Sequence, residues 1–154
     1  MRGVVGELGK VRPDDVTILD TEASIEHMTR GTVRTSDAVL LVTEPYFRSL
    51  ETTGRLAPLA QELGIPHVWA VANKVRTSTD EAAVREYCQR HGIELLAVVP
   101  FDPRVAEADN AGRAVLDHAP DAPAVLAARA LAQTLERRLS GQNGAGAPRN
   151  GDTA

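Results

Sequence analysis

Four short runs of apolar residues lie along the chain, and none of them alternates strictly between apolar and polar positions. Runs without alternation are typical of strands that are covered on both faces, as in a parallel sheet. We therefore predict strands at residues 16–20, 38–43, 67–73 and 94–100.

Between these runs, apolar residues recur at the three- and four-residue spacing of a helix with one buried face. We predict helices at residues 49–63, 79–90 and 122–139. Gly64 and Gly92 follow the first two as stop signals, and Thr79 or Asp80 is the expected cap of the second. Alternating strands and helices predict the α/β class, with a mostly parallel sheet of about four strands and helices on both faces.

The composition changes after residue 139, where Gly, Asn, Ala and Pro predominate. Such a segment buries too little apolar surface to offset its conformational entropy, so we expect a disordered tail at residues 140–154. Residues 1–139 have room for one α/β domain with a core of its own.

The formal net charge is −4, and acidic and basic residues are interspersed, so no basic stripe indicates a nucleic-acid partner. No apolar run approaches the ~20 residues of a membrane helix, and the first residues do not resemble a signal peptide. We therefore expect a cytoplasmic protein without a membrane segment. The single cysteine, Cys88, makes neither an internal disulfide nor a structural metal site.

Three of the predicted strands end in polar residues, at 20–24, 73–76 and 100–102. In parallel sheets, ligands bind at the carboxyl ends of the strands, which meet at one edge. Asp20 stands where nucleotide hydrolases keep the carboxylate that orders magnesium, often through water. The alternative for Asp20 alone is a strand-end Asp that forms a turn or a cap.

The residues from 18 to 32 resemble the second switch segment of MinD/ParA-type ATPases, which are P-loop proteins with a deviant Walker motif. Within it, Glu22-Ala23, Glu26-His27 and Arg30-Gly31-Thr32 resemble the CooC-type accessory ATPases of carbon monoxide dehydrogenase maturation. Further matches follow in order at residues 44–45, 48–52, 73–75, 100–102, 107–109 and 112. The resemblance covers roughly residues 10 to 135.

This resemblance implies a P-loop NTPase fold and a nucleotide switch that uses ATP and Mg²⁺, acting in metalloenzyme maturation or in the regulation of a partner protein. It implies that Asp20 is the catalytic switch carboxylate, which orders magnesium, with no side chain of the set binding the metal directly. It also implies that Ser24 lies on the phosphate side, where these relatives usually have a glycine.

Asn73-Lys74 also resembles the base-reading motif of GTPases, in which an Asp follows two residues after the Lys. Here that position is Arg76, which has donors and no acceptor, so adenine is expected instead of guanine. Asn73 is then expected to pair with the adenine edge, with Pro100 and Asp102 beside the ring. The alternative for Asn73 is a residue that caps the following helix.

The 154 residues contain no Gly-rich phosphate-binding loop. Glycines precede Lys10, but the residue after Lys10 is Val11, where such a loop has Ser or Thr. We therefore expect the C-terminal part of an ATPase, N-terminally truncated and inactive alone. The alternative is a non-catalytic binding or regulatory module. In either case we expect a homodimer, or a heterodimer with a full-length homologue. A third hypothesis is a stand-alone α/β ligand-binding domain of another family.

Overall fold

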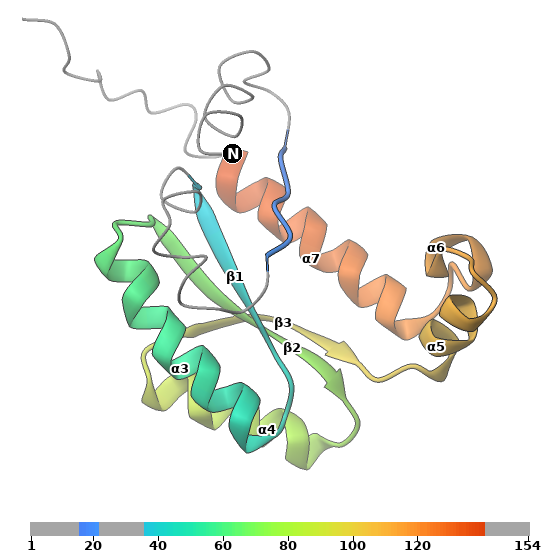
Figure 1. The fold of residues 1–154 in the computed structure, drawn as a ribbon, viewed down its shortest axis with the longest axis horizontal. Coiled ribbons are helices and arrows are strands. Elements are labelled where there is room, and N and C mark those ends of the chain that lie inside the picture. The colour runs from blue at the N-terminus through green and yellow to red at the C-terminus, as the bar shows by residue number, and fades with distance from the viewer. Residues whose placement is uncertain (1–15, 22–35, 141–154) are drawn as a thin grey trace, which may run out of the picture. The chain divides into compact units, whose positions relative to one another are not determined.

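The computed structural model of the chain describes residues 16–21 and 36–140. The chain forms two compact units, Met1–Asp102 and Pro103–Ala154. The described part of the first unit contains a parallel sheet with two helices, and that of the second unit is helical (Figure 1).

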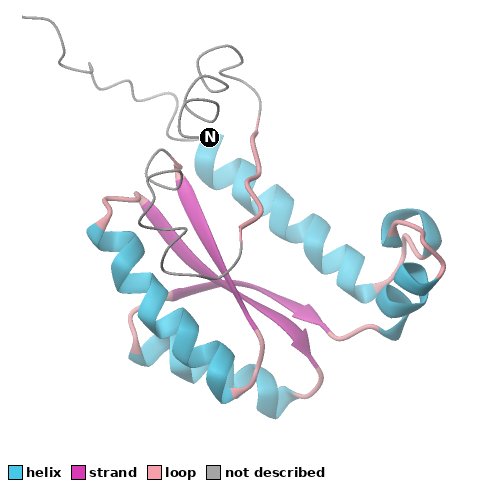
Figure 2. Cartoon of the chain, in the orientation of Figure 1, coloured by secondary structure: helices cyan, strands magenta, loops and turns pink. Residues whose placement is uncertain are grey.

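The sheet of the first unit has three parallel strands in the order β1 (Ala38–Thr43), β2 (His67–Val75) and β3 (Glu94–Pro100). Parallel neighbours need a crossover, and the helices α3 (Phe47–Glu62) and α4 (Ser78–Arg90) provide the two crossovers (Figure 2). The predicted strands at residues 38–43 and 94–100 are confirmed, and β2 continues past its predicted end at residue 73.

The predicted strand at residues 16–20 is wrong. Those residues form no regular secondary structure, and Val16 and Ile18 are 75% and 89% exposed. A strand is stable only where a neighbour pairs with its backbone groups, and none of the three described strands pairs with this segment. Asp20, which ends this segment, is therefore exposed and lies outside the sheet.

One apolar cluster joins α3 and α4 to the same face of the sheet, with Leu56 from α3, Val84 from α4 and Ala70 from β2 among its members. Neighbouring residues of a strand point to opposite faces, and Trp69 and Val71 of β2 are only 5% and 3% exposed. The central strand is thus covered on both faces, which explains why its sequence does not alternate.

The cap of α4 is Thr77, which lies shortly before the expected caps Thr79 and Asp80. The Thr77 hydroxyl accepts from the Asp80 backbone N–H at 3.1 Å, and the Asp80 carboxylate accepts from the Thr77 N–H at 3.0 Å. This reciprocal capping box satisfies two backbone donors, so Asp80 is its third helical residue and not the cap itself. The glycine stop signals are confirmed, with φ of 78° at Gly64 and 64° at Gly92.

The two helices approach closely where Gly54 of α3 meets Tyr87 of α4. A Cβ atom added at Gly54 would lie 3.2 Å from Cζ of Tyr87 and still closer to its hydroxyl. The Tyr87 ring is buried and stacks on His91 with centroids 4.0 Å apart, and its hydroxyl donates to Glu51 at 3.2 Å. Burial, and then the hydrogen bond to Glu51, raise the pKa of this hydroxyl above its usual value of 10.0, so it stays protonated.

We expect Gly54→Ala to lower the free energy of unfolding by about 1–3 kcal/mol, because the Tyr87 ring must move to admit the new methyl group. The intrinsic helix preference of Ala over Gly, about 1 kcal/mol, acts in the opposite direction. Urea titration followed by circular dichroism measures the difference. Tyr87→Phe removes the hydroxyl from the crowded site, so the double variant should lose less stability than the two single losses added together. A Gly54→Ala variant as stable as the parent would show that the helices have room to separate.

The second unit contains α5 (Pro103–Asn110), α6 (Val115–His118) and α7 (Pro123–Ser140). Its apolar cluster gathers Ala119, Ala122 and Val125. Helix α7 agrees closely with the helix expected at 122–139. Ser140, the first residue of the expected tail, is the last residue of α7, and residues 141–154 lie outside the described residues, so the disordered tail stays a prediction. No helix in the described part of the chain is both long enough and apolar enough to cross a membrane.

Candidate functional site

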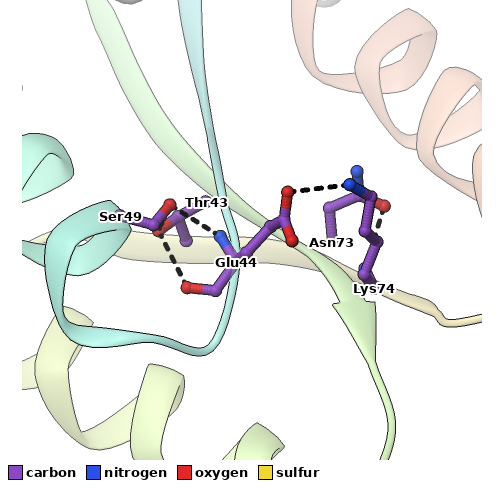
Figure 3. Close-up of polar contacts among 5 residues, drawn as sticks. All are labelled: Thr43, Glu44, Ser49, Asn73 and Lys74. Atoms are coloured by element: carbon purple, nitrogen blue, oxygen red, sulfur yellow. Dashed lines mark hydrogen bonds and ion pairs between the residues drawn. The ribbon is translucent and has the colours of Figure 1, made fainter.

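The carboxyl ends of β1 and β2 are joined by an ion pair (Figure 3). Lys74 Nζ donates to Oε1 of Glu44, the residue that follows β1, at 2.9 Å. The two side chains are 56% and 29% exposed, so the pair adds at most about 1 kcal/mol to stability. The ion pair matters more for the position of the two charged groups, which it holds beside each other at the edge where ligands of parallel sheets bind.

The turn from β1 into α3 is fixed by hydroxyl groups. Ser49 Oγ accepts from the Glu44 backbone N–H at 2.9 Å and lies 3.1 Å from Oγ1 of Thr43, which is fully buried. These contacts fix the backbone of Glu44, whose carboxylate pairs with Lys74 (Figure 3).

A bulge shapes the end of β2. Ala72 lies opposite Val98 and Val75 lies opposite Pro100, so β2 has one residue more than β3 between these pairs. Within the extra length, Lys74 has a φ of 56°, in the left-handed region that costs a lysine roughly 1–2 kcal/mol. Strained backbone of this kind is concentrated at functional sites.

The bulge also determines what Asn73 does. Its Oδ1 accepts from the Lys74 backbone N–H at 3.0 Å (Figure 3), which leaves two amide donors on the side-chain nitrogen for other partners. Because Thr77 caps α4, the alternative that Asn73 caps this helix is wrong.

Beyond the ends of β2 and β3, the guanidinium carbon of Arg76 lies 3.4 Å from the centroid of the Phe101 ring. The Phe101 N–H donates to the Val75 carbonyl at 2.8 Å, which continues the ladder past Pro100. Asp102 follows and is 7% exposed. The structure therefore brings the segments 73–76 and 100–102 together at one edge, as the sequence predicts.

The other two predicted site residues are not joined to this edge by any described contact. Asp20 is exposed and lies outside the sheet, and Ser24 lies outside the described residues. In residues 16–21 and 36–140, no group of His, Cys, Asp and Glu side chains is arranged to hold a metal ion. The assignment of Asp20 to magnesium and of Ser24 to phosphate stays a prediction.

Sequence reasoning missed the roles of Thr43, Glu44, Ser49 and Lys74 at this edge. Glu44-Pro45 and Arg48-Ser49 were recognised only as parts of a resemblance. The available signal was a serine at the start of a helix shortly after a strand, since such hydroxyls accept from nearby backbone N–H groups.

Comparison with known proteins identifies relatives of the chain, although no protein-family model matches it. It is 38% identical over 105 residues to an ATP-binding protein of Methanocaldococcus jannaschii, covering 68% of this chain and 41% of that protein. It is 35% identical over 106 residues to the carbon monoxide dehydrogenase accessory protein CooC of Rhodospirillum rubrum, covering 69% and 40%. The chain thus spans about two fifths of the length of these relatives.

Solved structures agree with the fold. The MinD cell division protein of Aquifex aeolicus superimposes with a TM-score of 0.72 at 21% identity, covering 97% of this chain and 62% of that one. MinD from Pyrococcus horikoshii, complexed with Mg-ADP, gives a TM-score of 0.70 at 22% identity, covering 89% and 57%. These matches confirm the predicted parallel α/β sheet of the P-loop NTPase type.

Proposed function

From the homology of this chain to the CooC- and MinD-type ATP-binding proteins, we propose that it forms the base-binding side of an ATP-dependent nucleotide switch. The observation that supports this best is the joined edge of β2 and β3, where Val75 pairs with Pro100 and Arg76 lies over Phe101. Polar side chains at the carboxyl ends of parallel strands form the usual ligand site of such sheets.

The ligand of this site is ATP with Mg²⁺. Relatives are described as ATP-binding, and a MinD with the same fold was solved with Mg-ADP. The amide of Asn73 pairs with the adenine edge, and Pro100 and Asp102 lie beside the ring. Asp20 orders magnesium through water, and Ser24 lies toward the phosphates.

The biological role follows from the relatives. The likeness to CooC favours an ATPase that assists the maturation of a metalloenzyme, and the likeness to MinD favours one that regulates a partner protein, since a MinC:MinD complex is among the similar structures. In either role the protein acts in the cytoplasm as a dimer. The second candidate is a non-catalytic module that pairs with a full-length homologue, which the absence of a phosphate-binding loop in these 154 residues favours.

We expect adenine nucleotides to bind in preference to guanine nucleotides. Recognition of guanine N1 and N2 needs an acceptor two residues after Lys74, and Arg76 has only donors. Competition of unlabelled ATP and GTP against a fluorescent ATP analogue measures the ratio of the two affinities.

Arg76→Asp introduces the missing acceptor and should move that ratio toward GTP by about tenfold or more, the effect of one charged hydrogen bond. Arg85→Asp, on the exposed face of α4, changes the net charge equally and should leave the ratio unchanged. Equal or tighter binding of GTP by the unchanged protein would rule out adenine as the base.

A further inference from the structure

Arg76 and Phe101 form an exposed stack at the edge of the sheet. The guanidinium carbon lies 3.4 Å from the ring centroid, Phe101 is 38% exposed, and Arg76 is exposed. An aromatic ring left partly open to solvent beside a planar cation is a common surface for binding bases, since every base has a face that can stack.

The backbone on both sides of this stack is fixed. The Asp80 carboxylate accepts from the Arg76 and Thr77 N–H groups, both at 3.0 Å, and the Phe101 N–H donates to the Val75 carbonyl at 2.8 Å. The Thr77 contact belongs to the capping box of α4, and the Phe101 contact extends the pairing of β2 with β3. The two planar groups are therefore positioned before any ligand arrives, which lowers the entropic cost of binding.

We propose that the Arg76 guanidinium, supported on one face by the Phe101 ring, is the platform on which the purine base stacks. This inference rests on the proposed nucleotide binding and adds two specific residues to it. A guanidinium is planar and weakly hydrated, so it stacks flat between two aromatic groups, whereas the ammonium of a lysine is compact, strongly hydrated and has no flat face to stack. The base, the guanidinium and the ring then form a stack of three.

The platform and Asn73 have separate tasks. Stacking is tolerant of base identity and supplies affinity, while the Asn73 amide, whose Oδ1 is already engaged by the Lys74 N–H, directs its donors to the base edge. Changes at Phe101 should therefore weaken adenine and guanine compounds alike, without changing the preference between them.

The test uses adenosine as the probe, because it has the base and no phosphate. Its affinity for the full chain is measured by NMR titration, following the Arg76 Nε–H and the ring protons of Phe101. Phe47, the other of the two phenylalanines, is 75% exposed and is the internal control for nonspecific stacking. Inorganic triphosphate is titrated in parallel as a probe without a base.

We expect Phe101→Leu and Arg76→Lys each to weaken adenosine binding by about tenfold and to leave the response to triphosphate unchanged. The double variant should be little weaker than either single variant, because the ring acts through the guanidinium. Phe47→Leu and Arg85→Lys are the matched controls and should bind as the parent does. Thermal melting of each variant establishes that it is folded.

Normal adenosine binding by a folded Phe101→Leu variant would overturn the platform while leaving nucleotide binding intact. Shifts of Phe47 equal to those of Phe101 would also overturn it. Absence of any adenosine binding by the parent chain at millimolar concentration would overturn both the platform and the proposed function.

Discussion

A polypeptide of these 154 residues, purified alone, should hydrolyse ATP no faster than the Mg²⁺ buffer around it. Phosphoryl transfer is accelerated mainly by positioning and by donors that stabilise charge on the transferred group. The backbone N–H groups, Lys and Ser or Thr of a Gly-rich loop provide these donors in P-loop proteins, and the printed sequence has no such loop. Removing a single donor of this kind costs about 10²–10³ in rate, so the loss of all of them leaves no measurable turnover.

The measurement is phosphate release from the purified chain, with Asp20→Ala as the control variant. If the chain is inactive as expected, both proteins give the buffer rate. Turnover by the parent that Asp20→Ala abolishes would contradict the prediction, because it would show a complete active site within this polypeptide. Turnover that survives in Asp20→Ala would indicate a contaminating ATPase.

The second large effect concerns stability. Strand β1 pairs with β2 on one side, and no strand in residues 16–21 and 36–140 pairs with its other side. The resemblance to MinD/ParA-type ATPases implies that the strand before the phosphate-binding loop would occupy that position. Each unmade ladder bond costs about 1 kcal/mol or more where its groups are buried, against a net stability of about 5–15 kcal/mol for a domain.

We therefore expect the isolated polypeptide to melt at low temperature and to self-associate through β1, which has low charge and in which Val42 is 60% exposed. A peptide with the strand and loop of the CooC relative should raise the melting temperature by about 5–10 °C at a hundredfold excess over its dissociation constant. A peptide of the same composition in scrambled order is the matched control.

Thermal melting and size-exclusion chromatography, each with and without the peptide, make the comparison. A cooperative monomer with a high melting temperature that does not respond to either peptide would contradict the expectation. The unit Met1–Asp102 would then be stable without a further strand beside β1.

Much of the fold could be predicted because local signals and tertiary structure agree. The runs at residues 38–43 and 94–100 form strands that pair with β2, and both were located correctly. The run at residues 16–20 is also rich in β-branched and apolar residues, yet it forms no strand here, because strand formation also depends on a pairing neighbour that the run itself does not encode.

The candidate site was predictable in position but not in detail. The positions of the segments 73–76 and 100–102 were predicted correctly because each directly follows an apolar run that is recognisable as a strand. The bulge at Lys74 and the stack of Arg76 on Phe101 depend on how two strands distant in sequence are aligned. Thr77 was missed as the cap because the local sequence offers several capping residues in succession, and only the geometry of the turn selects one.

Photolabelling with 2-azidoadenosine triphosphate, followed by mass spectrometry of the labelled peptides, tests the central claim most directly. This reagent attaches to residues in contact with the base. If the edge of β2 and β3 binds the base, the label should be found in residues 73–76 and 100–102, and excess ATP should prevent labelling more effectively than excess GTP. Label confined to other peptides, or labelling of these segments that excess ATP does not reduce, would show that this edge is not a base-binding site.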